Sequence, residues 1–273
     1  MFKRTMALAL LLSTSAHAAD LVEAPVIEDE TPVIENVSMD WSGLRVGVFG
    51  GGIHSTGEAE LGEIAGVLIP LDVGNGLFPR SIDDDEFGFT GGIGLGYDQQ
   101  LGNWIGGVEV DGSLTSLNVE HRFSRIDPNP AFPFTGVTTN TTYQTDIDWL
   151  ATARLRLGYV VSDNLMFYGT GGLAIGEVTN RFRLSIPDFP VAAGGPYTSP
   201  DWNESGTETG FVIGAGVEKK LSENLRLTFS IQYVDLGDVN VEGTDPAAFP
   251  GEEINYRFDN VFTTAKIGLT FSF

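Results

Sequence analysis

Charged residues alternate with apolar ones in several segments, and these charges are the first candidates for chemistry. Glu109 and Asp111 flank one valine, and Arg154 and Arg156 flank one leucine. Alternate residues of a strand share one face, so the two members of each pair would point the same way. Charges enclosed by a closed sheet must pair, because an isolated ion away from water is costly. The predicted internal network consists of Arg45, Glu109, Asp111, Arg154, Arg156, Glu218, Arg226 and Lys266.

A conducting pathway lined by the same charges is the alternative interpretation. A barrel of eight strands leaves an interior only wide enough for side chains, which favours pairing. A network that crosses the pore section would block ions, whereas unpaired charges would line a path for them. Because bases outnumber acids in this set, such a path would favour anions.

Groups suited to catalysis are scarce in the sequence. The chain has 3 histidines and no cysteine. His54 follows a predicted strand and His121 falls in a predicted loop, where each is expected to be a solvated imidazole. A rim histidine within about 3 Å of a serine or an acid would instead favour a lipid enzyme. The glycine run at 50–52 lacks the following helix that phosphate binding uses, so we expect no enzyme activity and no cofactor.

An acidic run is the one candidate cation site. Clustered oxygen ligands suit Ca²⁺, but the run lacks the spacing of a calcium-binding loop, and a solvated acidic surface is the alternative. Its members are Asp83, Asp84, Asp85 and Glu86.

Composition excludes several classes of protein. The chain of 273 residues carries a net charge of -22, which argues against a nucleic-acid partner because phosphate binding needs a basic face. Most of this charge falls on predicted loops and on an N-terminal tail, where it favours solubility and repulsion at a crowded surface. No segment approaches the ~18 consecutive apolar residues of a spanning helix, but a β-barrel spans without one.

The N-terminal segment predicts export. Lys3 and Arg4 precede an apolar run, and Ala16-His17-Ala18 is a small-residue cleavage pattern, so residues 1–18 are predicted to be a signal peptide. Residues 19–42 are acidic and contain prolines, which predicts a flexible periplasmic tail. Residues 43–273 form the remaining domain.

Period-two alternation recurs eight times after the tail, in strands of about 10–13 residues. One such row of outward apolar residues runs from Ile147 to Tyr159. Short connections, such as the turn Asp98–Asn103, alternate with four long ones, which are Ser55–Glu86, Thr115–Asp146, Gly176–Thr207 and Gly237–Asn260. Short periplasmic turns and long extracellular loops are typical of outer-membrane barrels. We predict an all-β fold, an eight-stranded antiparallel transmembrane up-and-down barrel with four long extracellular loops and both termini in the periplasm.

Aromatic residues test this assignment against a soluble β-sandwich, which would bury them centrally. Strand direction instead places them in two belts near the two ends, as two bilayer interfaces would select. The belt residues are Phe87, Phe89, Tyr97, Trp104, Trp149, Tyr159, Phe167, Phe211, Tyr233, Phe271 and Phe273.

Four motifs carry a resemblance to a known family. They are the opening Trp41-Ser42-Gly43-Leu44-Arg45, the segments Tyr168–Ala174 and Phe211–Glu218, and the run Tyr233–Gly237. In this order they resemble the small OmpA-like barrels, most closely the opacity-like, porin-family surface antigens of Gram-negative bacteria, with Arg45 where an aromatic residue is usual. The terminal Phe273 is similar to that family's assembly signal.

The resemblance implies a bacterial outer-membrane protein with an envelope-stabilising and adhesion or interaction role. Expected partners are outer-membrane lipid and lipopolysaccharide, the barrel-assembly machinery through the C-terminal strand, and a host or surface ligand at the loops. A small passive-diffusion porin and a rim-active lipid enzyme are the alternative functions.

Overall fold

The computed structural model describes residues 40–83, 85–127, 136–191 and 194–273. The predicted signal peptide, most of the predicted acidic tail and Asp84 lie outside the described residues. Within the part of the chain that is described, no helix is long and apolar enough to cross a membrane.

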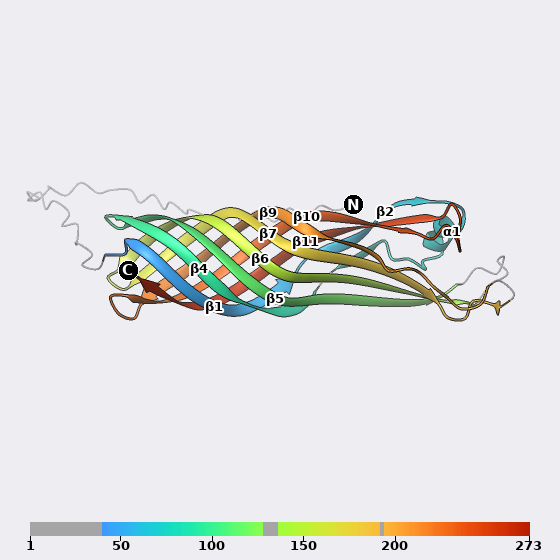
Figure 1. Ribbon diagram of the computed structural model, residues 1–273, viewed down its shortest axis with the longest axis horizontal. Coiled ribbons are helices and arrows are strands. Elements are labelled where there is room, and N and C mark those ends of the chain that lie inside the picture. The colour runs from blue at the N-terminus through green and yellow to red at the C-terminus, as the bar shows by residue number, and fades with distance from the viewer. Residues whose placement is uncertain (1–39, 84, 128–135, 192–193) are drawn as a thin grey trace, which may run out of the picture. The chain divides into compact units, whose positions relative to one another are not determined.

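Eight long antiparallel strands close into a ring (Figure 1). The ring closes where the first strand pairs with the last, with Arg45 opposite Ser272. This is the predicted fold class. In order around the ring the strands are β1 (Gly43–Ser55), β4 (Phe87–Leu101), β5 (Trp104–Ile126), β6 (Thr138–Ser162), β7 (Leu165–Ile186), β9 (Trp202–Lys220), β10 (Leu225–Thr244) and β11 (Glu253–Ser272).

The strands are longer than predicted, and the predicted loops are largely strand. β5 has 23 residues and β6 has 25. The prediction that four segments are loops along their whole length was therefore wrong. They are Ser55–Glu86, Thr115–Asp146, Gly176–Thr207 and Gly237–Asn260. They also contain β2 (Glu58–Ala65), α1 (Leu68–Gly74), β3 (Ser81–Asp83) and β8 (Tyr197–Thr198). The prediction ended each strand where outward apolar residues ended, although the period-two alternation continues with polar residues outward.

Register shifts accompany a reversal of the inward and outward faces part-way along two strands, β6 and β10, whereas β5 keeps its odd-numbered residues inward. The register shifts lie between Leu114 and Leu117, between Ile147 and Trp149, and between Asp235 and Asp238. An extra residue in one strand moves every later side chain to the other face. Ile147 was predicted to face outward, but the bulge turns it inward, where it is 2% exposed.

The bulges divide the barrel into two regions. The spanning region carries large apolar side chains on its outside, whereas the loop-end lobe carries polar ones there. The loop-end lobe comprises the described residues within 56–86, 117–147, 177–208 and 238–260.

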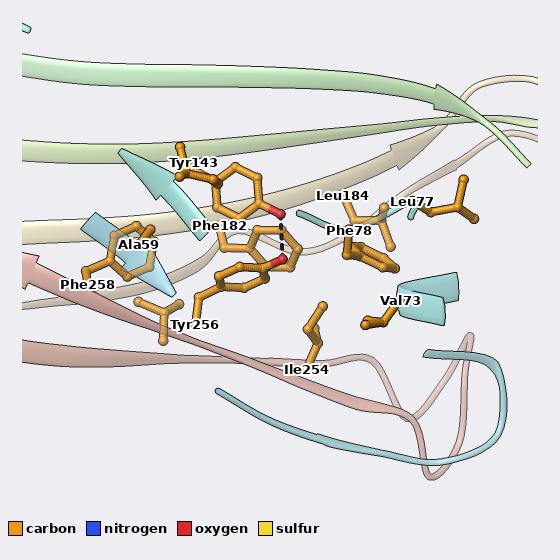
Figure 2. Close-up of a cluster of buried hydrophobic side chains, with 12 residues drawn as sticks. Ala59, Val73, Leu77, Phe78, Tyr143, Phe182, Leu184, Ile254, Tyr256 and Phe258 are labelled. Carbon is orange, nitrogen blue, oxygen red and sulfur yellow. Dashed lines mark hydrogen bonds between the residues drawn. The ribbon is translucent and has the colours of Figure 1, made fainter. Parts of the chain in front are cut away.

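The loop-end lobe is not a continuation of the closed ring. Pairing of β9 with β10 stops at Phe211 and Asp235, and β11 changes partner from β1 to β2 beyond Phe262. Two groups of strands remain, β5–β6–β7–β9 with β8 paired to β7, and β10–β11–β2–β3, and apolar side chains fill the space between them (Figure 2).

An aromatic centre joins the two groups. The Tyr143 hydroxyl donates to the Tyr256 hydroxyl at 2.9 Å, and the Phe182 ring lies 5.1 Å from both rings (Figure 2). The buried members of this core are Ala59, Val73, Leu77, Phe78, Ile82, Tyr143, Phe182, Leu184, Val241, Ile254, Tyr256 and Phe258.

Candidate functional site

The predicted internal charges lie inside the spanning region. The strands β1, β5, β6, β9, β10 and β11 supply them, and each side chain follows the inward parity of its strand. The structure brings all of them into one layer, in which side chains are at most 13% exposed. They are Arg45, Glu109, Asp111, Arg154, Arg156, Glu218, Arg226 and Lys266.

One half of the layer is built across β5 and β6. Glu109 is directly opposite Arg154 in the register, and Arg154 Nη2 forms ion pairs with both Glu109 and Asp111. Thr152 Oγ1 donates to Asp111 Oδ2 at 2.6 Å, and Lys266 Nζ lies 3.4 Å from Asp111 Oδ1. Cross-strand neighbours on one face approach closely enough for charge-assisted hydrogen bonds, so these groups satisfy one another.

The other half is centred on Glu218, which is 0% exposed. Its carboxylate lies 2.8 Å from Arg156 Nη1 and 3.4 Å from Arg226 Nη1. Arg45 joins the halves, because its Nη2 lies 2.6 Å from Glu109 and its Nε lies 3.0 Å from Asp98. The charged layer is therefore one connected network.

Asp98 is a network member that sequence reasoning missed. It was placed in the predicted turn Asp98–Asn103, but β4 continues to Leu101 and buries Asp98 completely. Its carboxylate lies 3.2 Å from Arg226 Nη1. The sequence did contain a sign of this position. Outward residues of β4 alternate up to Tyr97, so Asp98, the next residue, is expected to face the interior.

An apolar layer covers the network at the end of the short turns. Trp41 is 0% exposed, and its carbonyl accepts a hydrogen bond from Arg226 Nη2 at 3.0 Å. The Lys220 ammonium and the Arg226 guanidinium each lie 4.9 Å from the centroid of the Trp41 ring. Sequence reasoning had given Trp41 only a place in the opening motif. The layer consists of Trp41, Ile105, Val160, Met166 and Tyr168.

A second apolar layer covers the network on the side of the loop-end lobe. It comprises Ile53, Leu117, Val119, Ile147, Leu150, Ala174, Val178, Val212, Val234, Leu236 and Phe262. Between the two layers, the network lines a cavity of about 60 Å³, room for a few water molecules.

The predicted aromatic belts lie on the outside of the spanning region. Phe89 is 70% exposed at one end and Trp104 is 54% exposed at the other. Trp149 is the partly buried member, and its Nε1 donates to Glu177 at 2.9 Å. The ring of the terminal Phe273 lies 5.0 Å from that of Phe271.

The remaining candidates lie near the rim of the barrel. His54 Nε2 lies 2.8 Å from Asp85 Oδ1, and both side chains are exposed, whereas the neighbouring Ser55 is buried. His121 lies on β5 in the loop-end lobe. Asp83 and Glu86 are the first and last residues of the acidic run, and among the residues that the structure describes no group of three or more His, Cys, Asp or Glu is placed to hold a metal ion.

Comparison with known proteins identifies the family of this barrel. A family model described as the outer membrane protein beta-barrel domain matches residues 6–273. The chain belongs to this outer-membrane β-barrel family. Its location is accordingly the outer membrane.

Named relatives of this outer-membrane barrel are also outer-membrane proteins. It is 30% identical over 271 residues to the 31 kDa outer-membrane immunogenic protein of Brucella melitensis, covering 97% of each chain. It is 27% identical over 158 residues to a 22 kDa outer membrane protein of Rhizobium leguminosarum bv. viciae, covering 56% of this chain and 55% of that one. Among solved structures, OprG of Pseudomonas aeruginosa is similar, with a TM-score of 0.44, 12% identity and coverage of 85% and 96%.

Proposed function

We propose that this outer-membrane barrel is a non-conducting anchor that stabilises the envelope and displays its loop-end lobe outside the cell for adhesion or interaction. The observation that carries this proposal is the stacking of the interior, with the charged network lying between two apolar layers. Within the family, we propose the OmpA-like, opacity-like surface-antigen type, supported by the four motifs and the eight strands.

The energetics of the interior favour a plug. An ion entering from either end would first have to pass a layer of mostly apolar side chains, which offer few polar groups to replace its water. It would then have to displace guanidinium groups from carboxylates such as Glu218, which are matched and buried. The cavity of about 60 Å³ is lined by the same paired charges.

The proposed orientation places the short turns in the periplasm and the loop-end lobe outside. Long extensions on one end and short turns on the other are typical of outer-membrane barrels. The Brucella relative is named an immunogenic protein, which fits exposure of a lobe at the cell surface. Both termini would then be periplasmic, and the strand ending at Phe273 would be the segment presented to the barrel-assembly machinery.

A conductance measurement tests the anchor function. The refolded chain is inserted into planar lipid bilayers, and single-channel current is recorded at several voltages. We expect no steady channel from the unmodified protein. Large, steady conductance that persists unchanged in Glu109→Ala and Arg154→Ala would establish the alternative, a passive-diffusion porin.

Limited proteolysis of intact cells tests the orientation separately. Protease added outside should cut within Ser55–Glu86 or Gly237–Asn260 and should spare the short connection around Gly102. Cleavage that requires permeabilisation of the outer membrane would reverse the orientation.

A rim-active lipid enzyme is the second candidate, favoured by the 2.8 Å contact of His54 with Asp85. An exposed ion pair of this kind is ordinarily a weak surface contact. Ser55, the adjacent hydroxyl, is buried rather than turned toward the imidazole side of β1. Hydrolysis of phospholipid by the reconstituted protein, lost in His54→Ala, would establish this second function.

A further inference from the structure

A groove on the outer face of the loop-end lobe gathers arginines in an otherwise acidic protein. The groove has a volume of about 670 Å³ and lies across β5, β6 and β7. Arg122 on β5 is in register with Thr142 on β6, which is in register with Arg183 on β7. Arg122 and Arg183 therefore stand on either side of a short side chain, about 10 Å apart at the backbone.

The arginines of the groove have weak existing partners. Arg122 pairs with Glu120 and Arg183 pairs with Asp201, and all but Glu120 in these pairs are largely exposed to solvent. Exposed ion pairs of this kind contribute little free energy, so a multivalent anion could replace them. Arg181 Nη1 donates to Gln144 Oε1 at 3.2 Å, and its Nε has no hydrogen-bond partner among the described residues.

The charge of the groove is opposite to that of the chain. Its lining holds Arg122, Arg181 and Arg183 against a single acid, Glu120, whereas the whole chain has a net charge of -22. A local excess of guanidinium groups on the outer surface of an acidic protein favours binding of an anion at that place.

The height of the groove indicates which anion that is. Trp149 belongs to the aromatic belt and is in register with Glu177 on β7. Arg181 and Arg183 follow Glu177 on the same strand, about 13 and 20 Å further along it. Depending on whether these strands keep the barrel tilt of about 40° or run along the long axis, the groove lies roughly 10–20 Å beyond the lipid interface. The phosphorylated and carboxylated inner sugars of lipopolysaccharide occupy this level in an outer leaflet.

We propose that this groove binds the anionic inner-core sugars of a lipopolysaccharide molecule packed against β5, β6 and β7. Each arginine can donate in a fork to phosphate or carboxylate oxygens. The inference rests on the proposed orientation, in which the loop-end lobe faces outward. It adds a defined partner site to the proposed anchoring function.

Binding of purified lipopolysaccharide to the refolded full chain in detergent tests the proposal. The probe is fluorescently labelled deep-rough lipopolysaccharide, and the affinity is measured by thermophoresis. The variant Arg122→Gln/Arg181→Gln/Arg183→Gln should lose affinity at least about tenfold, since each charged hydrogen bond contributes more than a neutral one. Chemically dephosphorylated lipopolysaccharide, which keeps its sugar carboxylates, should bind the unmodified protein more weakly than the intact form does.

Arg257→Gln is the matched control. Arg257 is an outward arginine of the same lobe on β11, but its neighbours are the acids Glu60, Asp238 and Asp259. Its substitution should leave the affinity for lipopolysaccharide unchanged. The single variant Arg183→Gln, at an exposed position, serves if the triple variant does not refold, and it should also weaken binding.

Several outcomes would overturn the proposal. They are equal affinity of the triple variant and the unmodified protein, equal affinity for the dephosphorylated form, and an equal loss in Arg257→Gln. Tighter binding of heparin than of lipopolysaccharide, lost in the triple variant, would reassign the groove to a sulfated polysaccharide. Because the assay uses isolated protein, it can fail while the proteolysis test still supports the orientation, and the reverse also holds.

Discussion

The spanning region and the loop-end lobe are made from the same strands, but apolar side chains lie on the outside of the first and on the inside of the second. In the spanning part of β10, Ile231 points outward and is 49% exposed, while Gln232 points inward. In the lobe part of the same strand, Val241 points inward and is 1% exposed, while Asn240 points outward. The strand geometry is the same, so the surroundings decide which face is apolar. The spanning region must match lipid outside, whereas the loop-end lobe must exclude water inside.

The interiors differ as sharply as the exteriors. The spanning region encloses matched charges that fix each other's position, whereas the lobe encloses aromatic rings and aliphatic side chains (Figure 2). Charge pairing suits a narrow barrel, whose interior is closed by its own strands. Hydrophobic packing suits two separate groups of strands, because burial of apolar surface between them holds the groups together.

The largest effect is expected from breaking the charged interior. Glu218→Ala leaves Arg156 and Arg226 without their shared carboxylate and should destabilise the barrel by about 3–5 kcal/mol. Refolding titrations in urea measure this loss, and bilayer recordings should show a rise in conductance. Glu223→Ala, in an exposed turn, is the control and should change neither property. Unchanged stability and conductance in Glu218→Ala would show that the network does not hold the interior closed.

The next effect compares the two outer faces on one strand. Ile231→Arg places a charge in lipid near mid-membrane and should cost about 2–4 kcal/mol. Asn240→Arg places the same charge on the water-exposed face of the lobe and should stay within about 0.5 kcal/mol. Leu155 and Ile213, which also point outward in the spanning region, should behave like Ile231. Equal costs at Ile231 and Asn240 would remove the distinction between the regions.

A smaller effect is expected in the core of the lobe. The Tyr256 hydroxyl accepts from Tyr143 and donates to the Pro79 carbonyl at 2.7 Å. Tyr256→Phe removes both bonds and leaves buried partners unsatisfied, so the lobe should lose about 1–3 kcal/mol. Amide hydrogen exchange should speed up in β2 and in the outer part of β11 but not in the spanning region. Tyr97→Phe, on the exposed belt, is the control.

The smallest effect is a pH dependence of the lobe. Burial, with the nearby carboxylates of Asp127 and Glu252, raises the pKa of Asp72 to about 6. A carboxyl whose pKa is raised on folding favours the folded state when protonated, and this contribution is lost as pH rises through about 6. Lowering the pH from 7 to 5 should therefore stabilise the lobe by about 1 kcal/mol.

Hydrogen exchange of α1 amides at the two pH values, corrected for intrinsic rates, measures this gain. Asp259 shifts in the same direction, because burial and then Asp238 raise its pKa to about 6. Asp72→Asn should remove the part of the effect that belongs to α1. A lobe that exchanges faster at pH 5 than at pH 7 would contradict the expected sign.

Sequence reasoning found the spanning region because lipid imposes a simple rule there. Rows such as the one that ends at Tyr159 alternate apolar and polar residues, and the inward charges follow from the same parity. Asp98 and Ile147 escaped for related reasons. Asp98 lies where a strand runs on into an expected turn, and Ile147 lies beyond a bulge whose extra residue leaves no mark in the composition.

The loop-end lobe escaped prediction because its strands have a polar outside. Threonines, with Asn140 and Gln144, surround Tyr143 in β6, and such a polar run also occurs in loops. The apolar members of its core come from five segments far apart in the chain. No local window contains the contact between Tyr143 and Tyr256, which depends on the closure of the ring.

The change from apolar to polar outward side chains at the boundary of the two regions also determines how deeply the protein can sit in its membrane. A barrel with one uniform pattern could slide along the membrane normal by a residue pair at small cost. Here, movement toward the short turns would bring Asp146 and Arg181 into hydrocarbon, and movement toward the loop-end lobe would expose the ring of Trp149 and the outward leucines of β6 to water. The reversal beside Gly237, which has a φ of 80°, marks the same boundary on β10. Vertical position is thereby encoded in the strands themselves, so changes to the connecting tips between them leave the depth of insertion unaltered.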